Sequence, residues 1–364
     1  MTAVSSAAIR RHLTRKCAAL GIPACGNFEL TARCNLRCKM CYVRLTPEQM
    51  APIGRERTAE EWLELGRIAK DAGMVFLLIT GGEPTLRTDF AQIYEGLAQM
   101  GLSISINTNG TLLTPELKAL WHRLPPAQVN VTLYGTSRED YDALCGNPDA
   151  FDAVIDALDW LKNEGILIHL NTTIVPTNVH KWMEIEEFAK ARDLELRMTV
   201  YCFPPNRRGF HCFERLEPED AGEMIVRDVY YREGADSIKA RAKDLQSPQP
   251  NACELDNGEP MQCMAGRSQF WLTWHGEMTP CAMLTQPVTR PFEDGFLTAW
   301  EELKQKCQPI RLCPDCVNCP DQKSCMNCAA VTFAETGRFD GKPEYMCRMN
   351  RAYLKSLKDL AETL

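Results

Sequence analysis

The chain has 364 residues, of which 45% are hydrophobic and 24% are charged, a composition typical of a folded globular protein. Its net charge of −7 excludes the basic balance that attracts nucleic-acid phosphates, so we expect no nucleic-acid partner. The longest strongly apolar run, residues 74–79, is too short to span a bilayer, and the arginine-rich N-terminus is unlike a signal peptide. We therefore expect a cytoplasmic protein with no membrane partner.

Cysteine is the unusual feature of the composition. The chain has 18 cysteines, and they gather in a few short stretches. In a reducing cytoplasm, such a count favours metal binding over disulfide bonds. A disulfide scaffold would require export, for which the sequence carries no signal.

The first part of the chain has a regular alternation of apolar, β-rich runs and helical segments. Residues 1–26 predict a short amphipathic helix that precedes it. The predicted strands lie at residues 27–34, 74–84, 102–110, 128–135, 166–176 and 194–201. Alternating strands and helices predict a parallel sheet with right-handed crossovers. Six units are too few for a closed eight-stranded barrel, so we expect a partial (β/α)6 barrel over residues 27–215, with its functional residues at the carboxyl ends of the strands.

The second part of the chain follows different rules. Residues 216–258 predict a helical segment followed by a linker rich in proline, asparagine and glycine. In residues 259–349 the alternation of strands and helices stops and cysteines dominate, so this small domain needs a metal to stabilise it. Residues 350–364 predict a C-terminal amphipathic helix.

Three cysteines, Cys34, Cys38 and Cys41, follow the first predicted strand in the motif CxxxCxxC. Their soft sulfur atoms suit an iron–sulfur cluster or zinc. A structural zinc site would need a fourth cysteine or histidine nearby, and residues 42–50 contain neither. Three thiolates on a [4Fe–4S] cluster leave one iron open for another ligand.

Other candidate residues also follow predicted strands. The second strand ends in "GGEP", residues 81–84, where two glycines let the backbone approach a ligand closely. The third and fourth strands end near Asn107, Asn109 and Thr132, and Cys202 follows the sixth strand. The alternative interpretation for these polar residues is that they form ordinary turns.

The CxxxCxxC motif after one strand and GGEP after the next resemble the radical SAM enzymes. The resemblance implies that Cys34, Cys38 and Cys41 hold a [4Fe–4S] cluster whose open iron binds S-adenosylmethionine (SAM). One-electron cleavage of SAM in that family releases a 5′-deoxyadenosyl radical. The same resemblance assigns SAM contacts to Tyr42, Gly81, Gly82, Glu83, Pro84, Asn107, Asn109 and Thr132, with Glu83 accepting from the methionine ammonium group.

The later cysteines resemble the SPASM extension of radical SAM enzymes, which carries two auxiliary [4Fe–4S] clusters. By this resemblance, Cys263, Cys281 and Cys328 hold the first auxiliary cluster. The second is assigned to Cys316, Cys319, Cys325 and Cys347, which brings the expected total to three clusters. The fourth ligand of the first cluster stays open between Cys253, Cys307, Cys313 and the substrate. Structural zinc sites are the alternative for this whole region.

The family resemblance implies a hydrogen-abstracting enzyme that matures a ribosomally synthesised peptide by oxidative thioether or carbon–carbon crosslinking. The alternatives are a sulfatase-type maturase, a peptide epimerase that uses Cys202 as hydrogen donor, a small-molecule enzyme, or a non-catalytic electron carrier. Only about 27 residues precede the predicted barrel, which leaves no room for an N-terminal peptide-recognition domain. A leader peptide would then bind to a separate leader-binding protein or to the barrel itself, unless the substrate is a small molecule. An electron donor such as flavodoxin or ferredoxin is expected as well.

Overall fold

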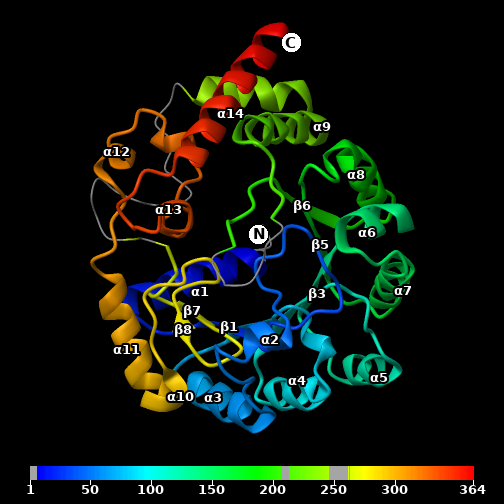
Figure 1. The fold of residues 1–364 in the computed structure, drawn as a ribbon, viewed down its shortest axis with the longest axis vertical. Helices are drawn as coiled ribbons and strands as arrows, with labels where there is room; N and C mark the ends of the chain where they lie inside the picture. The colour runs from blue at the N-terminus through cyan, green and yellow to red at the C-terminus, as the bar shows by residue number, and fades with distance from the viewer. Residues whose placement is uncertain (1–5, 206–212, 246–260, 262) are drawn as a thin grey trace, which may run out of the picture.

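A computed structural model describes residues 6–205, 213–245, 261 and 263–364 of the chain (Figure 1). Its centre is one sheet with the strand order β6-β5-β4-β3-β2-β1-β7-β8. The six predicted strands are confirmed as β1 (Cys25–Glu29), β2 (Phe76–Thr80), β3 (Ser103–Thr108), β4 (Gln128–Thr132), β5 (Ile168–Thr173) and β6 (Glu195–Thr199). Each of these strands pairs in parallel with its neighbours.

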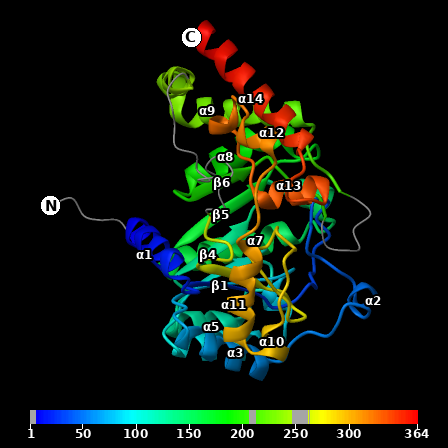
Figure 2. The ribbon, with the colours of Figure 1, turned by 90° about the vertical axis from the view of Figure 1, so that its left-hand side faces the viewer.

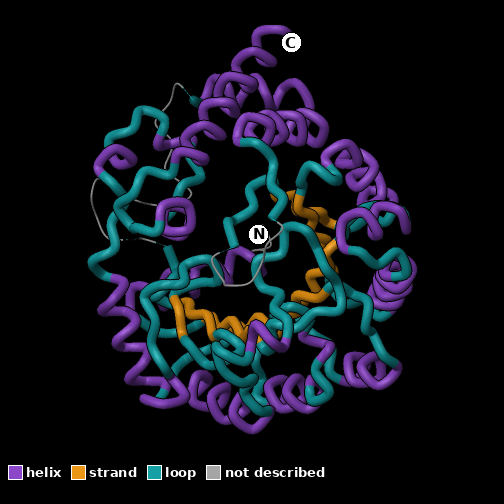
Figure 3. Tube along the Cα trace, viewed as in Figure 1, coloured by secondary structure: helices purple, strands orange, loops and turns teal. Residues whose placement is uncertain are grey.

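Helices surround the outer face of this curved sheet, and the sheet does not close on itself (Figure 3). The helices of the first part are α1 (Ser6–Leu20), α2 (Pro47–Met50), α3 (Ala59–Asp71), α4 (Phe90–Gln99), α5 (Pro115–Arg123), α6 (Arg138–Cys145), α7 (Ala150–Asn163) and α8 (Trp182–Ala191), with short 3-10 turns at Pro84–Leu86 and Val179–Lys181. Figure 2 shows α1 and α2 at opposite ends of the barrel. The fold is therefore the α/β partial barrel that the sequence predicts.

Helix α3 illustrates why the sequence forms this layer. The Thr58 side chain accepts from the Glu61 backbone amide, and the Glu61 side chain accepts from the Thr58 backbone amide. Together these two hydrogen bonds make a capping box. The apolar face of α3 then buries Trp62 completely against the sheet. The Trp62 ring lies 5.1 Å from the ring of Phe28 on β1, so the helix and the strand share one core.

The sheet extends further than the sequence pattern indicates. Strand β7 (Gln269–Leu272) pairs in parallel with β1, and β8 (Met278–Thr279) pairs antiparallel with β7. Neither strand is among the six that the sequence predicts. Strands of four and two residues are too short to show a clear alternation of buried and exposed positions. Helices α10 (Pro291–Asp294) and α11 (Phe296–Cys307) follow this hairpin.

The remaining segments pack on the β6 edge of the sheet. They form α9 (Pro218–Asp244), α12 (Pro314–Val317), a 3-10 turn at Gln322–Ser324, α13 (Ala329–Thr336) and α14 (Glu344–Thr363), and α14 starts before the predicted residue 350. A hydrophobic cluster joins Val200 and Tyr201, beyond β6, to Met224 of α9, Val331 of α13 and Met346 of α14. Within the part of the chain that the structure describes, no helix is long and apolar enough to cross a membrane.

Candidate active site

A cavity of about 340 Å³ lies at the carboxyl ends of the parallel strands. Thr173 at the end of β5 lines it. The other strands of the barrel contribute the predicted residues Cys34, Cys38, Cys41, Tyr42, Gly81, Gly82, Asn107, Asn109, Thr132 and Cys202. Residues that lie far apart in the sequence thus meet at the edge where function is expected. The cavity also reaches Met283, which follows the β7–β8 hairpin.

The three cysteines after β1 lie on a loop that already donates hydrogen bonds to their sulfur atoms. The Leu36 backbone amide lies 3.4 Å from the Cys34 Sγ, and the Arg44 amide lies 3.3 Å from the Cys41 Sγ. The Asn109 side-chain amide donates to the Cys34 Sγ over 3.7 Å. Such N–H···S bonds stabilise ligating thiolates and tune an iron–sulfur cluster.

Burial disfavours the charged form of these thiols in the protein alone. It raises the pKa of Cys34 to about 12 and the pKa of Cys41 to about 11, because a thiolate loses solvation there. The neighbouring cysteines raise both values further, so the thiols lie close to one another. A cationic group that binds thiolates would remove both penalties, and the residues present therefore fit an iron–sulfur cluster.

The two glycines after β2 are required by the protein's own backbone as well as by the cavity. The Gly82 amide donates to the Thr31 carbonyl over 2.8 Å, and the Glu83 amide donates to the Arg33 carbonyl over 2.9 Å. A Cβ on Gly81 or Gly82 would collide with the backbone of residues 31–33. The glycines thus let this loop pack directly against the segment that leads to Cys34, in addition to lining the cavity.

Glu83 lies outside the cavity lining and is completely buried. Its carboxylate accepts from the Thr85 hydroxyl at 2.5 Å, the Thr108 hydroxyl at 2.9 Å and the Asn109 amide at 2.7 Å. Burial raises its pKa, and these hydrogen bonds act in the opposite direction. Glu83 therefore ties the ends of β2 and β3 together, while its contact with the methionine ammonium group stays a prediction. Pro84 is likewise buried and outside the lining.

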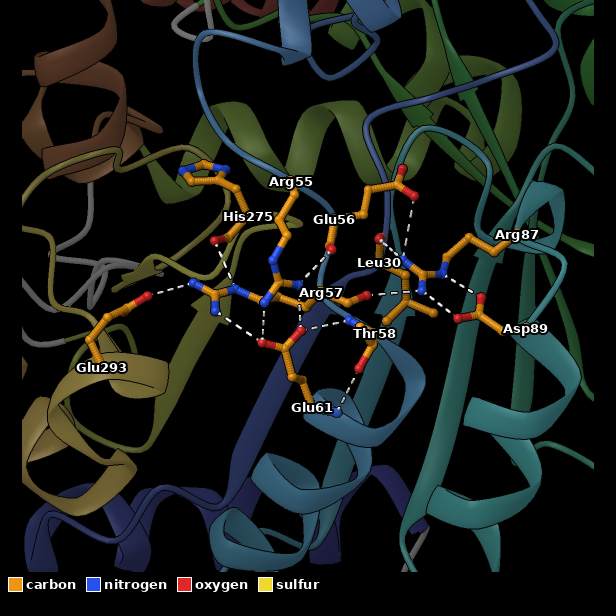
Figure 4. A network of polar contacts seen from close by, with 10 residues as sticks. All are labelled: Leu30, Arg55, Glu56, Arg57, Thr58, Glu61, Arg87, Asp89, His275 and Glu293. Carbon is orange, nitrogen blue, oxygen red and sulfur yellow. Dashed lines mark hydrogen bonds and ion pairs between the residues drawn. The ribbon is translucent and has the colours of Figure 1, made fainter.

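A second polar network, which the sequence reading missed, supports the same loops (Figure 4). The buried Arg87 donates to the carbonyls of Leu30 and Arg57 at 2.9 and 3.0 Å and pairs with Asp89 at 2.7 Å. The guanidinium of Arg57 extends the network to the β7–β8 turn through the His275 carbonyl at 3.0 Å. No sequence motif signals this network, because its members come from separate loops.

Several lining residues were also missed, among them Tyr134, Tyr201 and Met283. Tyr134 follows β4, and the rule that selected Thr132 would have found it. Its half-buried side chain carries a hydroxyl that hydrogen-bonds with the Cys38 thiol. Tyr201 donates to the Glu335 carboxylate over 2.7 Å and so joins the cavity rim to α13.

Cys202, the predicted hydrogen donor, lines the cavity as expected from strand order. Burial raises its pKa to about 12, so at neutral pH the side chain is a neutral thiol. A neutral thiol carries the S–H bond that hydrogen-atom donation would need. The position and the protonation state are therefore compatible with that role, which stays a prediction.

The C-terminal cysteines form two further groups. Cys316, Cys319, Cys325 and Cys347 line one cavity of about 410 Å³ beside the start of α14. The other predicted set also comes together, since the charges of Cys281 and Cys328 both raise the pKa of Cys263. Cys313 hydrogen-bonds with Cys316 and does not line the 410 Å³ cavity, whereas Cys253 lies outside the described residues.

The spacing of these thiols bears on the choice between zinc and iron–sulfur clusters. Among the described residues, no three His, Cys, Asp or Glu side chains are arranged to hold a single metal ion. Four thiolates on zinc would have to lie about 3.8 Å apart, given a Zn–S bond of about 2.3 Å. The more open arrangement around a 410 Å³ cavity suits a larger group such as a cubane.

This fold and this site define a class of enzyme. A partial α/β barrel places three loop cysteines, a glycine-rich turn and polar strand ends around one cavity. The Radical SAM superfamily profile matches residues 28–190, the segment that contains most of this lining. Residues 28–190 therefore carry a radical SAM domain, which in that superfamily binds SAM and a [4Fe–4S] cluster. The chain's cysteine-rich C-terminal part is consistent with a SPASM-type member.

Its relatives differ in what they make. The chain is 26% identical to the AdoMet-dependent heme synthase of Methanosarcina barkeri over 330 residues, which cover 86% of this chain and 93% of that protein. It is 25% identical to the antilisterial bacteriocin subtilosin biosynthesis protein AlbA of Bacillus subtilis over 280 residues, 76% of this chain and 59% of AlbA. The crystal structure of Streptococcus suis SuiB bound to S-adenosylmethionine shares the fold, with a TM-score of 0.66 at 17% identity over 95% of this chain and 84% of SuiB.

Proposed function

We propose that the enzyme removes a hydrogen atom from a substrate at the barrel mouth and then passes one electron to the first auxiliary cluster. SAM bound at the barrel cluster supplies the abstracting 5′-deoxyadenosyl radical when it is reduced by one electron. The substrate then loses the electron to the auxiliary cluster and a proton to solvent, so the product lacks two hydrogens. One observation carries this proposal: the cavity extends from Cys34 to Met283, two residues beyond the auxiliary ligand Cys281.

The chain's own residues supply binding and orientation in this proposal. The lining amide of Asn107 and the hydroxyl of Thr132 offer hydrogen bonds to the polar parts of SAM, and Asn109 lines the cavity beside them. Asn109 is itself fixed, because its side-chain nitrogen donates to the Asn35 oxygen over 2.8 Å and its side-chain oxygen accepts from the Thr111 hydroxyl over 2.7 Å. A side chain that is already fixed, as Asn109 is, loses little entropy when a ligand binds against it, and this favours one precise orientation of the ligand.

The remaining lining residues shape the apolar side of the cavity. Met40 and Tyr42 lie beside the third cysteine and suit contact with the adenine ring. Tyr134, Tyr201 and Phe203 give the rest of the cavity bulky aromatic walls. Such walls exclude solvent and the dissolved oxygen that would trap a reactive carbon radical.

The proposed substrate is a peptide, and its oxidation would form a thioether or carbon–carbon crosslink. The support is the likeness to AlbA, a bacteriocin biosynthesis protein, and the fold shared with SuiB, whose structure with the precursor peptide SuiA covers 94% of this chain. A separate leader-binding protein and an electron donor such as flavodoxin or ferredoxin belong to this proposal. The sulfatase-type maturase differs from it only in the peptide and in the bond that is formed.

A small-molecule substrate, namely a heme precursor, is a second candidate. The observation that favours it is coverage: the match spans 93% of the Methanosarcina barkeri heme synthase but 59% of AlbA. A tetrapyrrole is large and apolar with carboxylate arms, and the aromatic wall around Tyr134 and Tyr201 suits its ring. In this case too, the auxiliary cluster would accept one electron from the substrate radical.

The oxidative outcome is tested by product mass. Reconstituted enzyme with dithionite and SAM is incubated in D2O with candidate precursor peptides or with an iron-containing porphyrin precursor of heme. We expect a peptide product two mass units lighter than its substrate, or heme from the porphyrin, and we expect Cys202→Ala to stay active in either case. A peptide product one unit heavier through solvent deuterium, abolished by Cys202→Ala, would contradict oxidation and identify an epimerase.

A further inference from the structure

The first auxiliary cluster has three predicted thiolate ligands, from Cys263, Cys281 and Cys328, and lacks a fourth. We propose that the thiol of Cys307 is that fourth ligand. This inference rests on the proposed function, because it presupposes that the auxiliary cluster is present. It assigns a role to a buried cysteine that falls outside the SPASM spacing.

The position of Cys307 brings its sulfur to the loop that carries Cys263. Cys307 is the last residue of α11, and it is only 4% exposed. Its Sγ lies against Gly266, where an added Cβ would approach the sulfur to 2.5 Å. The Met261 amide donates to the Ile310 carbonyl over 3.3 Å, so the two chain segments run together next to this contact.

Gly266 is the residue that permits this approach. Its φ is +68°, a conformation that favours glycine, and it makes the tight turn between Cys263 and β7. Without a side chain at this position, the Cys307 sulfur can reach the backbone three residues beyond Cys263. The turn thus joins the end of α11 directly to the first auxiliary site.

The electrostatic environment of Cys307 points to the same thiols. Its pKa is raised to about 12, first by burial and then by the charges of Cys263 and Cys281. Within the described residues, the Cys307 thiol has no hydrogen-bond partner, although it is almost fully buried. Iron ligation would use this unpaired sulfur.

The other described candidate, Cys313, has a different neighbour. It hydrogen-bonds with Cys316, which belongs to the second auxiliary set. The Cys307 sulfur, in contrast, lies against Gly266, in the loop that follows Cys263. A cluster with four thiolates has no open iron, so it would accept electrons without binding the substrate.

The test uses the full chain with Cys34, Cys38 and Cys41 changed to alanine, so that only auxiliary clusters bind iron. Into this parent we introduce Cys307→Ser or, as the matched control, Cys253→Ser. We expect Cys307→Ser to lose about one iron per chain and to show a [3Fe–4S] electron paramagnetic resonance signal after mild oxidation, because one corner lacks its thiolate. The Cys253→Ser variant is expected to match the parent.

Two results would overturn the assignment: an unchanged spectrum in Cys307→Ser, or the three-iron signal in Cys253→Ser. If the parent variant binds no iron, the auxiliary clusters of the proposed function are absent. That result differs from either result above, so failure of the ligand assignment and failure of the proposed function are distinguishable.

If Cys307→Ser does not fold, alkylation of unmutated protein in mild denaturant gives a second measurement. Cluster loading should slow alkylation of Cys307 as much as that of Cys263 and leave the buried Cys17 unchanged; equal behaviour of Cys307 and Cys17 would refute ligation.

Discussion

The two cysteine-bearing regions of the molecule are built in opposite ways. In the barrel, the loop from Cys34 to Cys41 is held by the protein itself, through amide bonds to sulfur and the close packing of the Gly81–Gly82 turn. In the C-terminal region, the cysteines from Cys316 to Cys328 lie on turns and on a helix of only four residues. The comparison indicates that the barrel site forms before its cluster binds, whereas the C-terminal sites would depend on the clusters that we propose for them.

The largest expected effect separates the chemistry of the two regions. Changing Cys34, Cys38 and Cys41 together to alanine should abolish the conversion of SAM to 5′-deoxyadenosine, because no open iron remains to bind SAM. The sheet and the C-terminal iron should persist, since neither depends on these thiols. Chromatography of the nucleoside products measures the loss, and unmutated protein serves as the control. Continued cleavage in the triple variant would contradict the assignment of the barrel site.

Removal of iron by an anaerobic chelator should affect the regions unequally. We expect proteolysis between residues 313 and 328 to become at least ~10-fold faster, because these turns lose the group that stabilises them. The strands of the barrel should remain protected by their core. Mass spectrometry of the fragments from iron-loaded and iron-free protein provides the measurement. Equal protection of both regions in iron-free protein would show that the C-terminal part folds without metal.

A smaller effect tests how the barrel site is held in place. Glu83→Gln places an amide donor within a ring of donors, from Thr108 and the Asn109 backbone, and should cost ~1–3 kcal/mol in the free energy of unfolding. Glu60→Gln on the exposed face of α3 is the matched control and should change little. Denaturant unfolding measures both variants. An unchanged stability for Glu83→Gln would mean that this carboxylate does not hold the loop.

The sequence predicted the elements whose signal is local. Each of the six strands has its own apolar run, and CxxxCxxC and GGEP are contiguous motifs, so their place at one end of the sheet followed from topology. Asn107, Asn109 and Thr132 were found by the same rule.

The rest depends on contacts between distant segments. Strand β7 joins β1 from more than 200 residues away, and its four residues carry no clear period. The hydrogen bonds that hold Glu83 outside the cavity lining come from another strand. Cys307 lies outside any cysteine spacing pattern. Such residues are recognisable only when the fold brings them together, because each of them looks unremarkable in its local sequence.

We propose that two structurally different regions of one chain hold three iron–sulfur clusters. The most direct measurement is the iron and sulfide content of anaerobically reconstituted protein, combined with Mössbauer spectroscopy. Three cubanes predict about twelve irons per chain in the unmutated protein and about eight in the variant that lacks Cys34, Cys38 and Cys41. About four irons in the unmutated protein and none in the variant, or zinc in place of iron in the C-terminal region, would contradict the account.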